Sequence, residues 1–331
     1  MSREQVENRV HSINMATTQV GWIGLGSMGI GMSKNLQKYL SKSNAPSLLY
    51  TNRTLSRGDS LKEIGGVPIG SVGEVAAKSD VIFSCVSNDA VLQQVADEIV
   101  SSGNISKKVY VDCSTVHPET SVAVSKKISE AGGEFVAAPV FGAVPMAEAS
   151  KLIFVTAGPQ TATSKIAPYL NGVMGRSIIE MGTDVSKSSL LKIAGNVCVI
   201  SFMEVICEAH VFAEKTGLGC DILEKMLGDM FGPVLESYSK RVTTGAYIPA
   251  PGGKAGFDIQ LAIKDAKHAL NCAEEAGTRL EVSEVALSHL EKAKNLMGDR
   301  PLDSSSIYGA IRTDSGLDFL TDLCKKRDGV S

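Results

Sequence analysis

The sequence predicts an α/β domain with a doubly wound, mostly parallel sheet, followed by an all-α C-terminal domain. Short apolar segments alternate with helical stretches from residue 19 to about residue 182, as in a parallel sheet covered by helices on both faces. From Val185 to Thr216 there is no proline, only one glycine, and helical spacing of apolar residues. We expect a polar N-terminal extension at 1–17, an α/β domain at 18–182 and a helical domain at 183–331.

The expected strands of the α/β domain are short and apolar. One precedes Gly24, and the others lie at 47–51, 81–86, 108–112, 134–138 and 152–156. Ligands of such sheets bind at the carboxyl ends of the strands, so the residues that follow each strand are candidates for a site. Further helices are expected around 220–230, 257–276 and 282–297, with a loop that contains proline and glycine at 243–256.

The composition limits the classes of protein to which this chain can belong. The chain has 331 residues, 44% of them hydrophobic, and a formal net charge of −3, which is ordinary for two globular domains and gives no support for a nucleic-acid or membrane partner. We expect no apolar run long enough to span a bilayer. The seven cysteines are scattered and predict reduced thiols in an intracellular, cytoplasmic protein. The five histidines show no metal-ligand spacing, so no metal site is predicted.

A glycine-rich motif follows the first apolar segment. Its six residues are Gly24, Leu25, Gly26, Ser27, Met28 and Gly29, and a helix is expected to continue to about residue 40. This Gly-x-Gly-x-x-Gly pattern between a strand and a helix is typical of a Rossmann-type dinucleotide-binding unit. The first glycine permits a tight turn, the second lets the backbone approach a pyrophosphate, and the third allows close packing. Free N–H groups at the helix start would bind phosphate.

The residues after the second strand predict which dinucleotide binds. NAD sites usually carry a carboxylate here, for the ribose 2′-hydroxyl. This chain instead has Asn52, Arg53 and Thr54. Arg53 could pair with a 2′-phosphate and stack on adenine, while its neighbours add neutral donors. We therefore predict NADP(H) as the cofactor; the alternative is that Arg53 is a solvated loop residue.

Two further motifs carry residues suited to proton transfer. Asp112-x-Ser114-Thr115 ends a predicted strand, where hydroxyls could face a nicotinamide or a substrate, or cap the helix that Pro118 begins. Lys192 and Asn196 are four residues apart and share one helix face. A lysine there can act as general acid or base on a hydroxyl while the amide fixes orientation, although a lone helical lysine is more often a solvated surface residue.

These motifs, together with a Phe-x-x-x-Leu-x-x-Lys-Asp segment at 257–265, resemble in their order the β-hydroxyacid dehydrogenase family. That family includes 3-hydroxyisobutyrate dehydrogenase and tartronate semialdehyde reductase, and the resemblance covers residues 19–318. It implies hydride transfer between NADP(H) and a 3-hydroxy acid or its semialdehyde or ketone. The architecture is shared with 6-phosphogluconate dehydrogenase, whose helical region is much longer.

The resemblance also implies roles for individual residues. Lys192 would be the catalytic lysine, with Asn196 beside it at the substrate. Further cofactor contacts would come from Cys85, Val86, Ser87, Thr115 and Lys264. The substrate would lie against Ser114, Phe141, Gly142 and Ala143. Helical domains of the family usually pair across an apolar helix face, which here implies a homodimer or homotetramer through Val199, Met203 and Ile206.

Departures from the family pattern predict a changed substrate pocket. Phe141 stands where the family usually has a serine, and Ala143 and Met146 stand where it usually has glycines. Ser186 and Ser188 replace two glycines ahead of the lysine. The pocket should therefore be narrower and less polar, and the substrate bulkier or less polar. Two alternatives stay open: an imine reductase-like NADPH enzyme, a group that typically lacks this lysine, and a non-catalytic NADP-binding protein.

Overall fold

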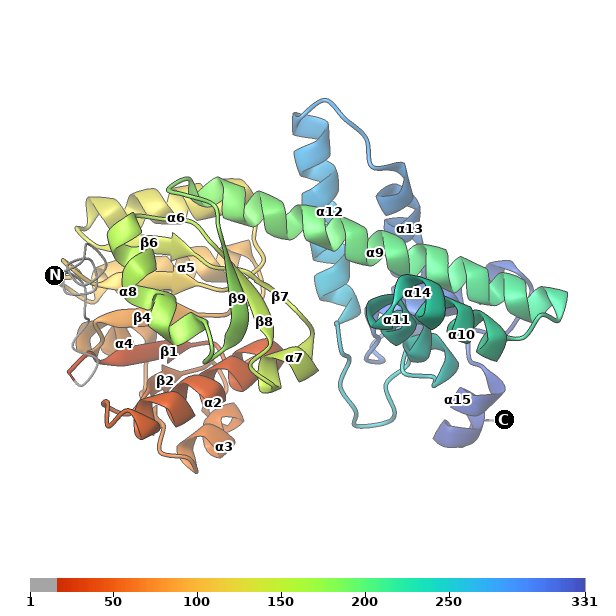
Figure 1. Cartoon of the computed structure of the whole chain (residues 1–331), viewed down its shortest axis with the longest axis horizontal. Coiled ribbons are helices and arrows are strands. Elements are labelled where there is room, and N and C mark those ends of the chain that lie inside the picture. Colours follow the sequence, from red (N-terminus) through yellow and green to blue (C-terminus); the bar gives the residue numbers. More distant parts are fainter. Residues whose placement is uncertain (1–16, 331) are drawn as a thin grey trace, which may run out of the picture. The chain divides into compact units, whose positions relative to one another are not determined.

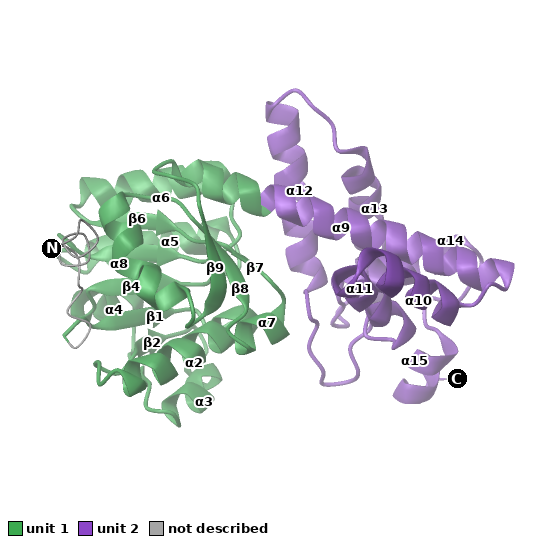
Figure 2. Cartoon of the chain, viewed as in Figure 1, with its two compact units in different colours: residues 1–192 green, residues 193–331 purple. Residues whose placement is uncertain are grey.

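The computed structural model describes residues 17–330. The expected polar extension at 1–17 thus lies outside the described residues, apart from Thr17. The chain divides into two compact units, the first ending at Lys192 and the second beginning at Ile193 (Figure 2). The division falls inside the helix α9, Val185–Thr216.

The main sheet of unit 1 has six parallel strands, in the order β3-β2-β1-β4-β5-β6. They are β1 (Val20–Ile23), β2 (Leu49–Thr51), β3 (Val67–Pro68), β4 (Val81–Ser84), β5 (Val109–Asp112) and β6 (Glu134–Ala137). The strand order reverses between β1 and β4, and this reversal is the point at which doubly wound sheets bind their ligands. The predicted doubly wound parallel sheet is confirmed.

A second, smaller sheet of unit 1 has the order β7-β8-β9. Its strands are β7 (Val140–Phe141), β8 (Leu152–Thr156) and β9 (Gly175–Glu180), with β7 antiparallel and β9 parallel to β8. The sequence pattern predicted β8 but did not separate it from the main sheet. It missed β3 and β7, which have only two residues each, and β9, which begins with a glycine and an arginine.

Helices cover both faces of the main sheet (Figure 1). Alternate residues of a strand enter opposite cores: Trp22 and Phe83 pack on one face, Ile23 and Ile82 on the other. The first core takes residues from α2 (Ser27–Lys42), α7 (Val144–Glu148) and α8 (Gln160–Leu170). The second takes residues from α4 (Val72–Lys78), α5 (Asp89–Ser101) and α6 (Pro118–Glu130). Near β2 lie the short η1 (Leu55–Gly58) and α3 (Asp59–Lys62).

All the named elements of unit 2 are helices. Besides the larger part of α9 they are α10 (Cys220–Phe231), α11 (Pro233–Thr243), α12 (Ile259–Glu275), α13 (Glu281–Met297), η2 (Ser304–Ser306), α14 (Ile307–Asp314) and α15 (Asp322–Asp328). Buried residues of α9, α12, α13 and α14 form one core. Met203 of α9 belongs to this core and Ile206 is 2% exposed, so the prediction that these two side chains form a surface for pairing is wrong.

Helix α9 corrects one expectation from the sequence. By length and composition alone it could cross a membrane, whereas no such run was expected. Its most apolar window is 39% buried within the protein. The helix also carries Glu204 and His210, both buried and hydrogen-bonded to other helices of the unit. Such paired polar groups are typical of the core helix of a helical domain.

Candidate active site

The three glycines of the first loop occupy three different environments. Gly24 has φ +93°, and a Cβ there would lie 2.3 Å from the carbonyl oxygen of Cys85. A Cβ on Gly29 would lie 2.2 Å from the carbonyl oxygen of Gly24. A Cβ on Gly26 would have no atom within 4 Å. Two glycines are therefore required by the packing of the chain itself, and the third leaves space that a side chain would fill.

The first turn of α2 is suited to bind phosphate. Gly26 is the N-cap residue, no side chain caps the turn, and the turn has no acidic residue. Ser27 and Met28 therefore present backbone N–H groups at the positive end of a 16-residue helix. With the open space at Gly26, these residues fit the pyrophosphate of a dinucleotide.

Asn52 holds the glycine loop in place. Its Oδ1 accepts a hydrogen bond of 2.9 Å from the backbone N–H of Leu25, and its Nδ2 donates one of 2.8 Å to the carbonyl oxygen of Thr54. The side chain of Leu25 is 2% exposed and packs in the core, so only its backbone is available to a ligand. The sequence predicted that Asn52 contacts the cofactor; the structure gives its amide two backbone partners.

Arg53 and Thr54 are both exposed at the end of β2. Within residues 17–330, Arg53 makes no ion pair. The guanidinium is therefore available to an anionic ligand at this strand end.

The residues after β4 border the glycine loop. Cys85 donates its backbone N–H to the carbonyl oxygen of Ile23 at 2.9 Å, and its own carbonyl faces Gly24. Val86 is half-buried and Ser87 is exposed. The structure thus brings this predicted segment to the same edge of the sheet as the first loop.

A buried hydrogen-bond network joins the ends of β4 and β5. Asp112 is 2% exposed, and its Oδ1 accepts hydrogen bonds from Ser84 Oγ at 2.7 Å and Ser114 Oγ at 2.6 Å. Ser114 Oγ in turn accepts a bond of 2.8 Å from the backbone N–H of Val86. The hydroxyl of Ser114, predicted to face the substrate, is thus used within the protein to fix the strand ends.

The same network extends to a residue that sequence reasoning missed. Tyr110 OH lies 2.9 Å from Ser84 Oγ, and burial is the main cause that raises the pKa of Tyr110 well above its usual range. Neither Ser114 nor Thr115 caps α6, because His117 is its N-cap residue. Thr115 itself is half-buried.

Lys192 is not a solvated surface residue. It is only 9% exposed, and its Nζ lies 4.8 Å from the centroid of the Phe141 ring. A cation over an aromatic face contributes about 0.5–2 kcal/mol, depending on how much water it has lost. Phe141 belongs to β7, and Gly142 and Ala143 follow it directly. The predicted substrate contact Phe141 and the predicted catalytic lysine therefore lie together in unit 1.

Two serines fix the first turn of α9 ahead of the lysine. Ser188 Oγ donates a hydrogen bond of 2.6 Å to the carbonyl oxygen of Val155 in β8. Ser189 Oγ lies 2.8 Å from Ser121 Oγ in α6. Ser188 stands where the family resemblance implies a glycine, and its hydroxyl is what ties this turn to β8. No sequence pattern predicted either contact.

Unit 2 holds the other predicted site residues. Asn196 Nδ2 donates a hydrogen bond of 2.6 Å to Oδ2 of Asp265, and Lys264 Nζ forms an ion pair of 2.9 Å with Oδ1 of the same carboxylate. Asp265 is 3% exposed. The structure thus joins Asn196 and Lys264 through a carboxylate that was absent from the predicted site.

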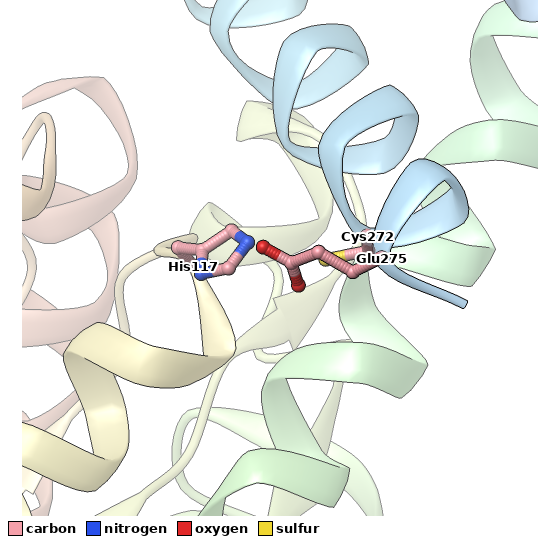
Figure 3. A group of neighbouring side chains, drawn as sticks. All are labelled: His117, Cys272 and Glu275. Atoms are coloured by element: carbon pink, nitrogen blue, oxygen red, sulfur yellow. The ribbon is translucent and has the colours of Figure 1, made fainter. Parts of the chain in front are cut away.

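Figure 3 shows three side chains with atoms that could ligate a metal. His117 begins α6 in unit 1, whereas Cys272 and Glu275 lie on α12 in unit 2. Two side chains within one unit are too few for a metal site of protein ligands. We assign none to either unit among the described residues.

Comparison with known proteins relates both units to one family. Residues 19–182 match the model of the NAD binding domain of 6-phosphogluconate dehydrogenase. Residues 187–311 match the model described as NAD-binding of NADP-dependent 3-hydroxyisobutyrate dehydrogenase.

Two relatives match nearly end to end. The NADH-dependent oxidoreductase ucdB of Aspergillus ustus is 31% identical over 89% of this chain and 99% of its own. Glyoxylate/succinic semialdehyde reductase 1 of Arabidopsis thaliana is 30% identical over 89% of this chain and 98% of its own.

Solved structures share the fold. 3-Hydroxyisobutyrate dehydrogenase of Salmonella typhimurium has a TM-score of 0.77 at 20% identity and covers 88% of this chain and 99% of its own. An imine reductase of Pseudomonas sp. has a TM-score of 0.59 at 18% identity, with 89% and 99% covered. The ordered motifs, the two family models and the two full-length relatives lead to one conclusion: this chain belongs to the β-hydroxyacid dehydrogenase family of NAD(P)-binding oxidoreductases.

Proposed function

We propose that this chain is an NADP(H)-dependent oxidoreductase that transfers a hydride between the nicotinamide and a 3-hydroxy acid or its semialdehyde or ketone. The observation that carries the proposal is the position of Lys192, a sheltered cation over the Phe141 ring in the unit that also holds the glycine loop. A lysine kept from solvent beside a predicted substrate surface is suited to general acid–base chemistry.

In this mechanism the residues of the chain bind the cofactor, orient the substrate and transfer a proton. The glycine loop and the start of α2 bind the pyrophosphate. A nicotinamide cofactor held there would supply or accept the hydride at the reacting carbon. In reduction, the carbonyl π bond breaks as the hydride arrives, and Lys192 Nζ gives its proton to the carbonyl oxygen. Lys192 then regains a proton from water; in oxidation every transfer is reversed. Asn196 and Lys264, both held by Asp265, are proposed to contact substrate and cofactor.

NADP(H) is proposed over NAD(H) because Arg53 is exposed and has no ion-pair partner within the described chain. A guanidinium pairs with a phosphate monoester, whereas the 2′-hydroxyl of NAD calls for a carboxylate. The name of the Aspergillus ustus relative gives NADH for that protein, so both cofactors belong in every assay.

A homodimer or homotetramer is proposed from the surface of unit 2. Large apolar side chains there are strongly exposed, which in a globular protein marks a surface for association. They are Phe202, Val205, Phe212, Leu218, Ile222, Met226, Met230, Phe231 and Val234. Sedimentation velocity of the wild type beside Phe212→Glu tests this: a lighter species in the variant supports it, and an unchanged monomer contradicts it. We also propose a cytoplasmic location, because all seven cysteines are free thiols.

The activity is tested by following nicotinamide absorbance with purified protein. Wild type and Lys192→Ala are assayed with 3-hydroxy acids and NADP⁺ or NAD⁺, with semialdehydes and the reduced cofactors, and with cyclic imines and NADPH. Turnover of the acids that falls by about a hundredfold or more in the variant supports the proposal. Turnover of imines alone supports an imine reductase, a class with which the chain shares its fold. NADPH binding without any turnover supports a non-catalytic protein.

A further inference from the structure

Phe141, which lies beside Lys192, belongs to an unbroken run of apolar residues. From Ala138 to Ala147 no side chain donates a hydrogen bond, and the one acceptor is the weak thioether sulfur of Met146. The run contains all three residues of the predicted substrate segment at 141–143. Phe141 is half-buried, and Met146 is 47% exposed. A ligand that meets this segment therefore meets hydrocarbon groups, the thioether of Met146 and backbone.

The run is held in a fixed conformation from both ends. Val140 and Phe141 pair with Phe154 and Ile153 of β8. Gly142 follows with φ +127°, a value that favours glycine. At the far end, Asn35 Nδ2 of α2 donates a hydrogen bond of 2.7 Å to the carbonyl oxygen of Ala147. The run from Ala138 to Ala147, here called the apolar wall, is thus attached to the small sheet and to the helix that begins at the glycine loop. Because these attachments fix its backbone, its apolar side chains keep their positions in the site.

Phe141 has a second contact that a small polar residue could not make. Its ring lies 4.8 Å from Nζ of Lys192, while the lysine is only 9% exposed. A serine at this position would offer a hydroxyl to substrate but no face for the ammonium. The ring therefore limits where Nζ can lie, and it removes a hydrogen-bonding group from the surface next to it.

We propose that Phe141 determines the substrate class of this site, by positioning Lys192 Nζ and by selecting substrates whose reacting carbon carries a branched-alkyl or aryl group. This inference rests on the proposed function. An apolar substituent leaves water when it packs on Phe141, whereas a hydroxyl or carboxylate there loses hydrogen bonds that the wall cannot replace. One such difference between two substrates changes the ratio of their kcat/KM values by about ten- to a hundredfold.

Three hydroxy acids that differ only at the reacting carbon test the selection. They are 3-hydroxypropanoate, 3-hydroxy-4-methylpentanoate and 3-hydroxy-3-phenylpropanoate, oxidised with NADP⁺. We expect kcat/KM of the wild type to favour the last two over the first by at least about tenfold. In Phe141→Ser this ratio should fall by about tenfold or more, mainly through KM. Val122→Ser removes an exposed apolar side chain from α6, outside the predicted site, and should leave the ratio unchanged.

Conservative variants separate positioning from general packing. Phe141→Leu keeps an apolar wall without an aromatic face, so it should retain the preference but lose kcat by several-fold. Phe141→Tyr restores the ring and should restore kcat. Equal kcat values in the two variants would overturn the positioning role.

Binding without turnover distinguishes this inference from the proposed function. Calorimetry with NADPH-saturated protein measures affinity for each hydroxy acid, because the reduced cofactor cannot oxidise it. Tighter binding of the two apolar acids by the wild type, lost in Phe141→Ser, supports the role of Phe141. If these acids bind in this way but none is oxidised, the proposed function fails while the role of Phe141 stands. Equal affinities in the wild type, no binding of any of the acids, or a preference that survives in Phe141→Ser would overturn the inference.

Discussion

The Nδ2 of Asn196 donates a 2.6 Å hydrogen bond to Oδ2 of Asp265, although the two residues are 69 positions apart in the chain. The other carboxylate oxygen of Asp265 lies 2.9 Å from Nζ of Lys264. Because Asp265 is 3% exposed, the hydrogen bond from Asn196 and the ion pair with Lys264 both act on a carboxylate that is largely out of water, where electrostatic interactions are stronger. One carboxylate thus orients an amide and an ammonium that the family resemblance assigns to substrate and cofactor.

Replacing Asp265 by Asn should disturb both partners at once. The variant keeps the size of the side chain but loses its charge, so the ammonium of Lys264 loses its counter-ion. We expect about 1–3 kcal/mol lower free energy of unfolding and about tenfold lower kcat/KM. Urea unfolding and steady-state kinetics measure these, with Glu274→Gln, an exposed change on the same helix, as the control. Normal kinetics in a destabilised variant would mean that Asp265 serves only the fold.

The glycine loop allows cofactor binding to be separated from folding. Alanine at Gly26 meets no atom within 4 Å and keeps an ordinary φ of −69°, so the fold should be unaffected. The added methyl group would instead occupy the space open to a pyrophosphate, and we expect NADPH to bind about tenfold or more weakly. Quenching of protein fluorescence by NADPH, together with the melting temperature, measures the two effects.

Gly24→Ala is the matched comparison for that experiment. Its φ of +93° and the carbonyl oxygen 2.3 Å from the new Cβ make the substitution destabilising in itself. The loss of stability should therefore be large at Gly24 and small at Gly26. Unchanged NADPH affinity in Gly26→Ala would show that the ligand does not approach this glycine.

The sequence was most informative where structure is local. The glycine motif and the helix Val185–Thr216 depend on neighbouring residues, and the structure has both at the expected positions. Strands of two residues, such as β3 and β7, are too short for a periodic pattern and were missed. That β8 belongs to a separate sheet depends on its pairing with β7 and β9, which were not predicted, so this arrangement was missed too.

Hydrogen-bond partners were the part of the site that sequence could not supply. Asn52 and Ser114 have the right chemistry to bind a ligand, yet each has partners within the fold. Leu25 and Val86, one partner of each, follow other strands, and only the tertiary structure brings them close. The role of Asp265 depends in the same way on α9 packing against α12, and that of Ser188 on contact with β8.

Arg53 should decide between the two nicotinamide cofactors. If it pairs with a 2′-phosphate, Arg53→Ala should raise KM for NADPH by about ten- to a hundredfold, as expected for a lost charge-assisted contact. KM for NADH should change little, because NADH has no phosphate there. Arg57→Ala, a second exposed arginine of the same segment, is the control. Equal effects on both cofactors would contradict a specific contact with the phosphate.

Buried His210 should make the stability of the protein depend on pH. The side chain is 0% exposed, and its Nε2 lies 2.8 Å from Ser239 Oγ. Burial is the main cause that lowers the pKa of His210 below its usual 6.5, although Glu224 opposes this effect. The folded state therefore binds a proton less readily than the unfolded state. This contribution to stability is complete above the unfolded pKa and is lost as pH falls from about 6.5 through the lower pKa of the folded state.

His210→Gln removes the titrating group but keeps an amide that can bond to Ser239. We expect the free energy of unfolding of the wild type to fall as pH decreases from about 7 to 5, with a smaller fall in the variant. Urea unfolding across this range measures both curves. The difference between them, rather than the stability at any one pH, is the diagnostic quantity, because the substitution also changes packing. Two parallel curves would show that His210 does not contribute to the pH dependence.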